Sequence, residues 1–141
     1  MNSKLHAVVD HNGMPVAMTL TEGQRSDHIG AKILYPVLPS QEEAALYGDR
    51  QPTLVGDRGY DSDEFRAALA SKGIDVCIPP IPSRKKPLEY DKRLYKKRNQ
   101  VERFFGRIKD GRRIATRYDR CADIFMAAIT IAAIFTTYLN Q

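Results

Sequence analysis

Cysteine is scarce in this chain, which has only Cys77 and Cys121 among its 141 residues. Two cysteines are too few for a disulfide framework, and no Cys and His cluster has the spacing of a zinc site. Glycine and proline are also few, at nine and eight residues. Collagen-like, fibrous and disordered classes are therefore excluded, and the composition is that of a globular protein in a reducing compartment.

Long hydrophobic runs are missing as well. The longest uncharged stretch, 124–141, contains three threonines and an asparagine, and it falls short of the ~20 apolar residues that span a bilayer. The first six residues lack the apolar core and cleavage site of a secretory signal. We therefore expect a cytoplasmic protein without a membrane partner, and a length of 141 residues suits a single domain.

Positive charge is concentrated in one part of the chain. The stretch from Arg84 to Arg120 carries fifteen Lys and Arg against five Asp and Glu, whereas the rest of the chain is net negative. Such asymmetry is typical of a protein with a polyanionic partner, most often nucleic acid. The alternative is a basic helix face that is merely solvated.

The pattern of apolar residues predicts a mixed sheet. Four β-type runs lie at 5–9, 14–20, 53–56 and 74–78. Asn12-Gly13 between the first two is a strong hairpin signal. A helix expected over 63–72 joins the last two, and such βαβ connections are parallel and right-handed. The predicted fold class is therefore α/β, with an N-terminal β-hairpin followed by a βαβ unit.

Further helices are expected from Ser26 or Asp27 to about Leu34, over 92–109 and over 122–139, while 41–51 is ambiguous. On a wheel of about 100° per residue, the 92–109 helix places Glu102 on one stripe with Tyr95, Arg98 and Lys109. Arg103 and Arg107 fall on a separate basic face. Taken alone, Glu102 could be a salt-bridged surface residue.

Asp57 follows the third predicted strand directly. Open α/β sheets place their ligand crevice beyond the carboxyl ends of the strands, so this is a position for a functional carboxylate. The alternative is a turn-forming Asp ahead of Arg58-Gly59. Asp57 and a carboxylate on a nearby helix could together hold Mg²⁺ or Mn²⁺, which take oxygen ligands.

The remaining histidines and cysteines carry no such pattern. His6, His11 and His28 show no catalytic or metal spacing and are expected at the surface or in turns. Cys77, on a predicted strand, is expected to be a small core residue.

Tyr95, Arg98, Glu102 and Lys109 are spaced as Y-(2)-R-(3)-E-(6)-K. This resembles the signature of bacterial insertion-sequence DDE transposases, and the segment 54–62 around Asp57 is similar to the region of that family's second catalytic Asp. The resemblance covers almost the whole chain. It implies an RNase H-like fold and a two-metal site that cuts DNA at the transposon end and joins the freed 3′-OH to target DNA.

The resemblance also implies roles for individual residues. Asp57 and Glu102 would be the second and third catalytic, metal-binding carboxylates, with Mg²⁺ or Mn²⁺ as the cofactor. Residues expected to bind DNA are Tyr95, Arg98 and Lys109 near the scissile phosphate, and Arg103 and Arg107 on the basic face.

The family's first catalytic Asp lies on a strand before this hairpin, and here only Met1-Asn2-Ser3 precede the hairpin. No residue of the chain therefore maps to that Asp. Asp10 abuts Asn12-Gly13 and is expected in the hairpin turn rather than as a substitute ligand. Residues 1–141 are therefore interpreted as a single partial RNase H-like DDE transposase catalytic domain that lacks the first strand.

This interpretation implies a C-terminal portion that needs an upstream transposase fragment, or self-association, for activity. One alternative is a catalytically inactive fragment that acts as a DNA-binding or regulatory module. Another is a generic basic RNA- or DNA-binding domain with structural carboxylates.

Overall fold

The computed structural model describes residues 3–49 and 51–111, with side chains as far as Ile108. The chain divides into two compact units, Met1–Gln24 with Asn99–Gln141, and Arg25–Arg98. The helix expected over 122–139 and Cys121 lie outside the described residues. Within those ranges, no helix is both long enough and apolar enough to cross a membrane.

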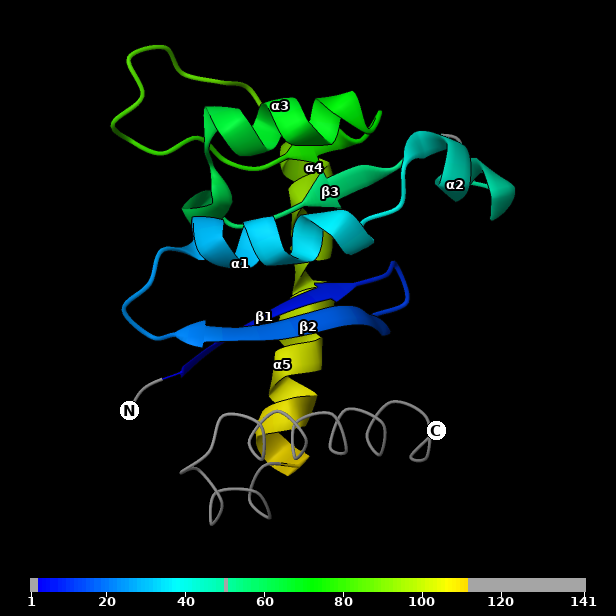
Figure 1. Cartoon of the computed structure of the whole chain (residues 1–141), viewed down its shortest axis with the longest axis vertical. Coiled ribbons are helices and arrows are strands. Elements are labelled where there is room, and N and C mark those ends of the chain that lie inside the picture. The colour runs from blue at the N-terminus through cyan, green and yellow to red at the C-terminus, as the bar shows by residue number, and fades with distance from the viewer. Residues whose placement is uncertain (1–2, 50, 112–141) are drawn as a thin grey trace. The chain divides into compact units, whose positions relative to one another are not determined.

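The first unit contains a β-hairpin and a helix. Strands β1 (Ser3–Val9) and β2 (Pro15–Glu22) pair antiparallel, as predicted, and α5 (Asn99–Gly111) packs against β1 (Figure 1). Asp10 stabilises the turn, because its Oδ1 accepts hydrogen bonds from the backbone N–H groups of Asn12 and Met14, both at 2.9 Å. The predicted turn role of Asp10 is confirmed.

The core of this unit lies between α5 and the hairpin. Phe104 and Ile108 are buried, and they pack against a set of partly buried apolar side chains on both strands: Leu5, Ala7, Val9, Met18 and Leu20. Gly13 adopts the left-handed φ of +78° at the hairpin turn. Arg107 Nη2 donates to the Gly13 carbonyl oxygen at 2.9 Å, which ties the turn to α5.

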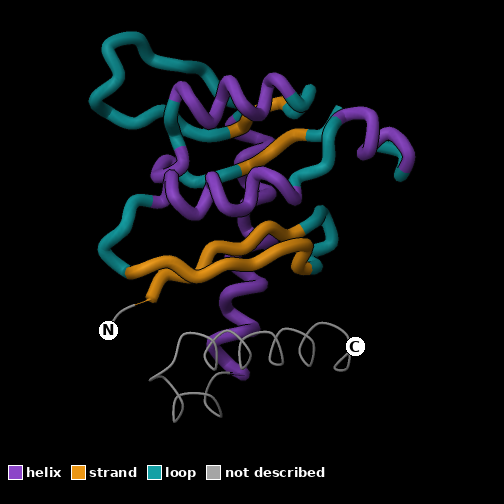
Figure 2. Tube along the Cα trace, viewed as in Figure 1, coloured by secondary structure: helices purple, strands orange, loops and turns teal. Residues whose placement is uncertain are grey.

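The second unit is an α/β arrangement around two short strands (Figure 2). Its elements are α1 (Asp27–Leu34), α2 (Gln41–Leu46), β3 (Thr53–Val55), α3 (Asp63–Ser71), β4 (Asp75–Cys77) and α4 (Lys92–Tyr95), with 3₁₀ turns at Tyr35–Val37, Arg58–Tyr60 and Lys96–Arg98. Strands β3 and β4 pair in parallel, with Leu54 opposite Val76, and α3 connects them. The predicted βαβ unit is confirmed.

Short polar side chains begin the helices of this unit. Ser26 and Ser62 accept hydrogen bonds from the first turns of α1 and α3, which satisfies backbone N–H groups that have no partner within the helix. In the ambiguous 41–51 stretch, Ser40 and Glu43 form a reciprocal capping box, and this explains why α2 forms there.

The segment predicted as one helix over 92–109 is helical throughout, but the prediction of a single α-helix is wrong. A 3₁₀ turn, Lys96–Arg98, separates α4 from α5. An α-helix through this segment would stack Lys92 on Lys96, and like charges four residues apart are destabilising. Because a 3₁₀ turn has about three residues per turn, one α-helical wheel does not relate Tyr95 and Arg98 to Glu102.

Two further expectations differ from the structure. The described strands form two separate two-stranded sheets, one antiparallel and one parallel, instead of a single mixed sheet, because no described strand pairs with both β3 and the hairpin. His6 is buried at 1% exposure, where its Nε2 lies 2.9 Å from Thr21 Oγ1 across the hairpin. This hydrogen bond compensates the cost of burying a polar ring.

Candidate functional site around Asp57

Asp57 begins the loop that leaves the β3 and β4 pair. Gly56 extends the pairing by one hydrogen bond from its N–H to the Cys77 carbonyl oxygen, at 3.2 Å. The backbone carbonyl of Asp57 then accepts from Tyr60 N at 2.9 Å to form the 3₁₀ turn. The Asp57 carboxylate caps no backbone N–H, and its side chain is 53% exposed. The backbone therefore makes the turn and the carboxylate stays available for other contacts.

Tyr95 and Arg98, the first two residues of the Y-(2)-R-(3)-E-(6)-K pattern, both contact Asp57. Arg98 Nη1 forms an ion pair with Asp57 Oδ1, and the Tyr95 hydroxyl donates to the same oxygen at 3.4 Å. The Arg98 guanidinium also lies 5.6 Å from the centroid of the Tyr95 ring. Among the described residues, Asp57 Oδ2 receives no hydrogen bond. The structure thus brings three of the predicted site residues together.

Two phenols next to Asp57 are held in their protonated form. Burial, followed by the negative charges of Asp27 and Asp57, raises the pKa of Tyr60 to about 12. Burial also raises the pKa of Tyr95, although the Arg98 guanidinium opposes the shift. Both hydroxyl groups can therefore donate hydrogen bonds at neutral pH.

Asp27 lies close to the backbone of the same loop. A Cβ atom on Gly59 would come within 2.2 Å of Asp27 Oδ2, so any larger residue there would require the Asp27 side chain to move. Helix α1 carries Asp27 in its first turn and contacts the 3₁₀ turn Arg58–Tyr60. The sequence indicated Asp27 only as a possible helix cap, because nothing local places it beside Gly59.

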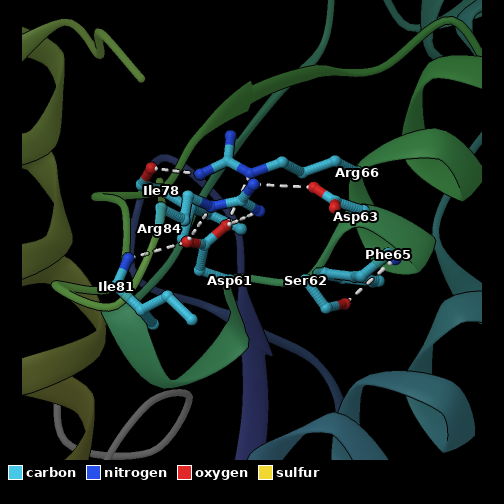
Figure 3. Close-up of polar contacts among 8 residues, drawn as sticks. All are labelled: Asp61, Ser62, Asp63, Phe65, Arg66, Ile78, Ile81 and Arg84. Carbon is cyan, nitrogen blue, oxygen red and sulfur yellow. Dashed lines mark hydrogen bonds and ion pairs between the residues drawn. The ribbon is translucent and has the colours of Figure 1, made fainter. Parts of the chain in front are cut away.

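Asp61 lies at the end of this loop and is buried in a cluster of guanidinium groups (Figure 3). It is 2% exposed and accepts from Arg66 Nε at 2.7 Å, from Arg84 Nε and Nη2 at 2.7 and 2.8 Å, and from Ile81 N at 2.7 Å. Arg66 Nη2 also donates to the Ile78 carbonyl oxygen at 2.7 Å. Hydrogen bonds from Arg84 and Arg66 hold the pKa of Asp61 well below its usual range. Sequence reasoning missed this cluster, because its members are as many as 23 residues apart.

The other predicted residues are on α5, in the unit that does not contain Asp57. Glu102 and Arg103 are exposed, whereas Arg107 is partly buried and donates to Gly13. Lys109 belongs to α5, but its side chain lies outside the described part of the chain. Because Asp57 and Glu102 belong to different units, their convergence stays a prediction.

A complete metal site is not present among the described residues. In that part of the chain, no three His, Cys, Asp or Glu side chains are grouped so that they could hold a metal ion.

Comparison with known proteins places the chain in a family. It matches the family model described as a transposase DDE domain over residues 1–136. It is 35% identical over 133 residues to a Brucella ovis protein provisionally named as the transposase for insertion sequence element IS6501, with 94% of this chain and 95% of that protein covered.

A second relative, from Burkholderia cepacia, is provisionally named as the transposase for insertion sequence element IS402. It is 34% identical over 130 residues, and the match covers 92% of this chain but 59% of that protein. No solved structure matches the chain. The match of one family model to nearly the whole chain, with two insertion-sequence relatives above 30% identity, shows that the chain belongs to the DDE transposase family.

Proposed function

We propose that this chain supplies part of the active site for metal-dependent DNA cleavage and strand transfer by an insertion-sequence transposase. The observation that carries this proposal is the contact of Tyr95 and Arg98 with Asp57, since these residues come from two motifs far apart in the sequence. Asp57 and Glu102 are the proposed catalytic, metal-binding carboxylates. The family membership supports DNA as the substrate and a divalent ion as the cofactor.

The chemistry of Asp57 is compatible with a metal ligand. Its side chain is half-exposed, and its Oδ2 accepts no hydrogen bond from the described residues. Mg²⁺ and Mn²⁺ prefer such carboxylate oxygens. When bound, such an ion activates the attacking oxygen and neutralises the leaving oxygen in displacement at phosphorus.

The protein side chains have separate tasks in this proposal. Arg98 holds the Asp57 carboxylate through Oδ1 and brings a positive charge to the phosphodiester beside it. Tyr95 donates to the same oxygen and fixes its orientation. The proposed DNA contacts from α5 are Arg103, Arg107 and Lys109, which would position phosphates without reading the sequence.

The third carboxylate of the site is proposed to come from outside the described residues, because Asp10 is held in the hairpin turn. An upstream transposase fragment or a second copy of the chain would supply it, and residues 1–141 would form a partial RNase H-like domain that acts in the cytoplasm. A second candidate is an inactive module that binds transposon-end or target DNA. It is favoured by the absence of a three-residue metal cluster from the described residues.

The experiment compares two purified proteins: the chain alone, and the chain fused to the polypeptide that is encoded immediately upstream of it. Each protein is incubated with a labelled transposon-end duplex and Mg²⁺ or Mn²⁺. We expect the fusion to cut and join DNA, and Asp57→Asn and Glu102→Gln each to abolish the reaction. Glu42→Gln, which neutralises an exposed carboxylate on α2, should leave it unchanged.

Two results would decide against the proposal. Cleavage that survives Asp57→Asn would remove Asp57 from the site. A fusion that binds the duplex but does not cut it would support the inactive DNA-binding module instead.

A further inference from the structure

The loop formed by residues 79–90 leaves the end of β4 and returns to it. Its two ends are close, because Cys77 Sγ donates to the carbonyl oxygen of Asp91 at 3.4 Å. Compact surface loops of about 6–16 residues whose ends meet are often functional. In Figures 1 and 2 this loop projects from the second unit between β4 and α4.

Both ends of the 79–90 loop are tied to the segment that carries Asp57. At the first end, the carboxylate of Asp61 accepts from Ile81 N at 2.7 Å, and Asp61 follows the 3₁₀ turn that Asp57 begins. At the second end, the Tyr90 ring meets the Tyr95 ring edge to face, with 5.6 Å between centroids. Tyr95 in turn donates to Asp57.

All three guanidinium nitrogens of Arg84 donate hydrogen bonds inside the protein. Its Nε and Nη2 donate to Asp61, and its Nη1 donates to Asp63 Oδ1 at 2.7 Å (Figure 3). An ionised carboxylate is costly to bury unless it is well paired, and Asp61 meets that condition through four hydrogen bonds. The cluster therefore fixes the path of the loop, and a phosphate would have to compete with Asp61 and Asp63 for the Arg84 guanidinium.

Lys85 and Lys86 follow Arg84 and differ from it in their contacts. Both are exposed, and within the described part of the chain neither forms a hydrogen bond or an ion pair. A lysine ammonium group binds phosphate as a compact positive charge, and this loop carries two such groups without a partner among the described residues. The anchoring lowers the conformational cost of binding them, since the loop is already ordered.

We propose that the 79–90 loop is a DNA-backbone clamp in which Lys85 and Lys86 contact phosphates of the strand that lies at Asp57. Arg84 is the positioning residue of this clamp. The inference rests on the proposed function, because it takes Asp57 as the point at which the DNA is cut.

The test measures the affinity of the full chain for a duplex of arbitrary sequence over a range of salt concentrations. EDTA is present, so that binding is separated from catalysis. Replacing both lysines, Lys85→Ala with Lys86→Ala, should reduce the slope of log K against log salt by about 1.8, because each lost phosphate contact contributes ~0.9. The control, Arg25→Ala with Lys32→Ala, removes two exposed charges of the same unit that already have partners in the protein, and it should leave the slope unchanged.

Arg84→Lys tests the positioning role, because it keeps the positive charge but loses the three-nitrogen fork. We expect weaker duplex binding at every salt concentration, and a thermal denaturation curve for each variant verifies that it is folded. Retained affinity in Arg84→Lys would show that Arg84 does not position the clamp.

The outcomes separate this inference from the proposed function. An unchanged salt slope in the double lysine variant, with normal binding by the parent chain, would overturn the clamp and leave the proposed catalysis standing. A reduced slope, with a fusion protein that never cuts DNA, would support the clamp and overturn the catalysis. A parent chain that binds no duplex would overturn the clamp directly.

Discussion

Asp57 and Asp61 are four residues apart and have opposite surroundings. The Asp57 side chain is 53% exposed and contacts Arg98, whereas the Asp61 side chain has no exposure and pairs with both Arg66 and Arg84. An exposed carboxylate can exchange ligands, while a buried one with four hydrogen bonds cannot do so without disrupting its surroundings. Asp57 is therefore suited to the proposed site, whereas Asp61 is a structural anchor.

Asp61→Asn should reduce the dependence of stability on pH. The folded pKa of Asp61 is far below the ordinary value of 3.8, so its contribution is present above that pH and is lost as the pH falls below it. We expect the free energy of unfolding to fall less steeply between pH 5 and pH 3 in the variant, by at most about 1.4 kcal/mol per pH unit. Urea denaturation at several pH values measures this, and an equal slope in both proteins would contradict it.

Asp27→Asn should lower the pKa of Tyr60 from about 12, because the negative charge of Asp27 opposes ionisation of the phenol. The ultraviolet absorbance of tyrosinate, followed against pH, reports this change. Tyr60→Phe identifies which step of the titration belongs to Tyr60. A Tyr60 step at the same pH in the Asp27 variant would show that the charge of Asp27 does not contribute to the shift.

At this scale, the sequence allowed the roles of only some residues to be predicted. The spacing of the motif marked Tyr95 and Arg98, and the position after a strand marked Asp57, but the sequence did not predict that these three side chains contact one another. Asp27 and Asp61 were missed because their partners are distant in sequence and no spacing connects them. The burial of His6 was missed for the same reason, since Thr21 reaches it only across the paired hairpin.

The interruption between α4 and α5 shows what periodicity omits. The apolar positions of the 92–109 segment gave the core face of α5 correctly, with Phe104 and Ile108 buried. The apolar positions say nothing about the repulsion of Lys92 and Arg93 by Lys96 and Lys97, which follow them by four residues. The hairpin, α1 and the βαβ unit were predictable because each has a local turn or cap residue.

Phe104→Ala should destabilise the unit of the hairpin and α5 strongly. Phe104 is completely buried against the hairpin, and loss of a buried aromatic side chain typically costs about 3–5 kcal/mol. Chemical denaturation measures the change in the free energy of unfolding. The control is Val16→Ala on β2, which is 54% exposed and should cost less than ~0.5 kcal/mol; similar losses in both variants would place Phe104 outside the core.

For the whole molecule, family membership and substrate class could be inferred from one motif and one charge asymmetry. Neither observation determines how a complete site would be assembled. The ligand count from the motifs is two carboxylates, and one of them belongs to each unit.

The purified chain alone should therefore not cut or join DNA at a measurable rate, even with Mn²⁺. A two-metal mechanism needs its ions fixed relative to the attacking and leaving oxygens, and small misplacements cost ~10²-fold in rate. Cleavage of a labelled transposon-end duplex is the measurement, with Asp57→Ala as the control. Robust cleavage that disappears in the control would show that the chain completes its own site.

The boundary between the two units falls inside the Y-(2)-R-(3)-E-(6)-K motif. Residues 25–98 are inserted between β2 and α5, so the units are joined by two peptide junctions, and the second falls between Arg98 and Asn99. The residues between Arg98 and Glu102 are thus a tether between the partner of Asp57 and the other proposed ligand. One inserted residue there would change no side chain of the motif, but in helical form it would move Glu102 by about 1.5 Å along the helix axis and turn it by about 100° relative to Arg98. If the proposed roles of Asp57 and Glu102 hold, a length change at this junction is expected to abolish transposition by the insertion sequence without altering the core of either unit.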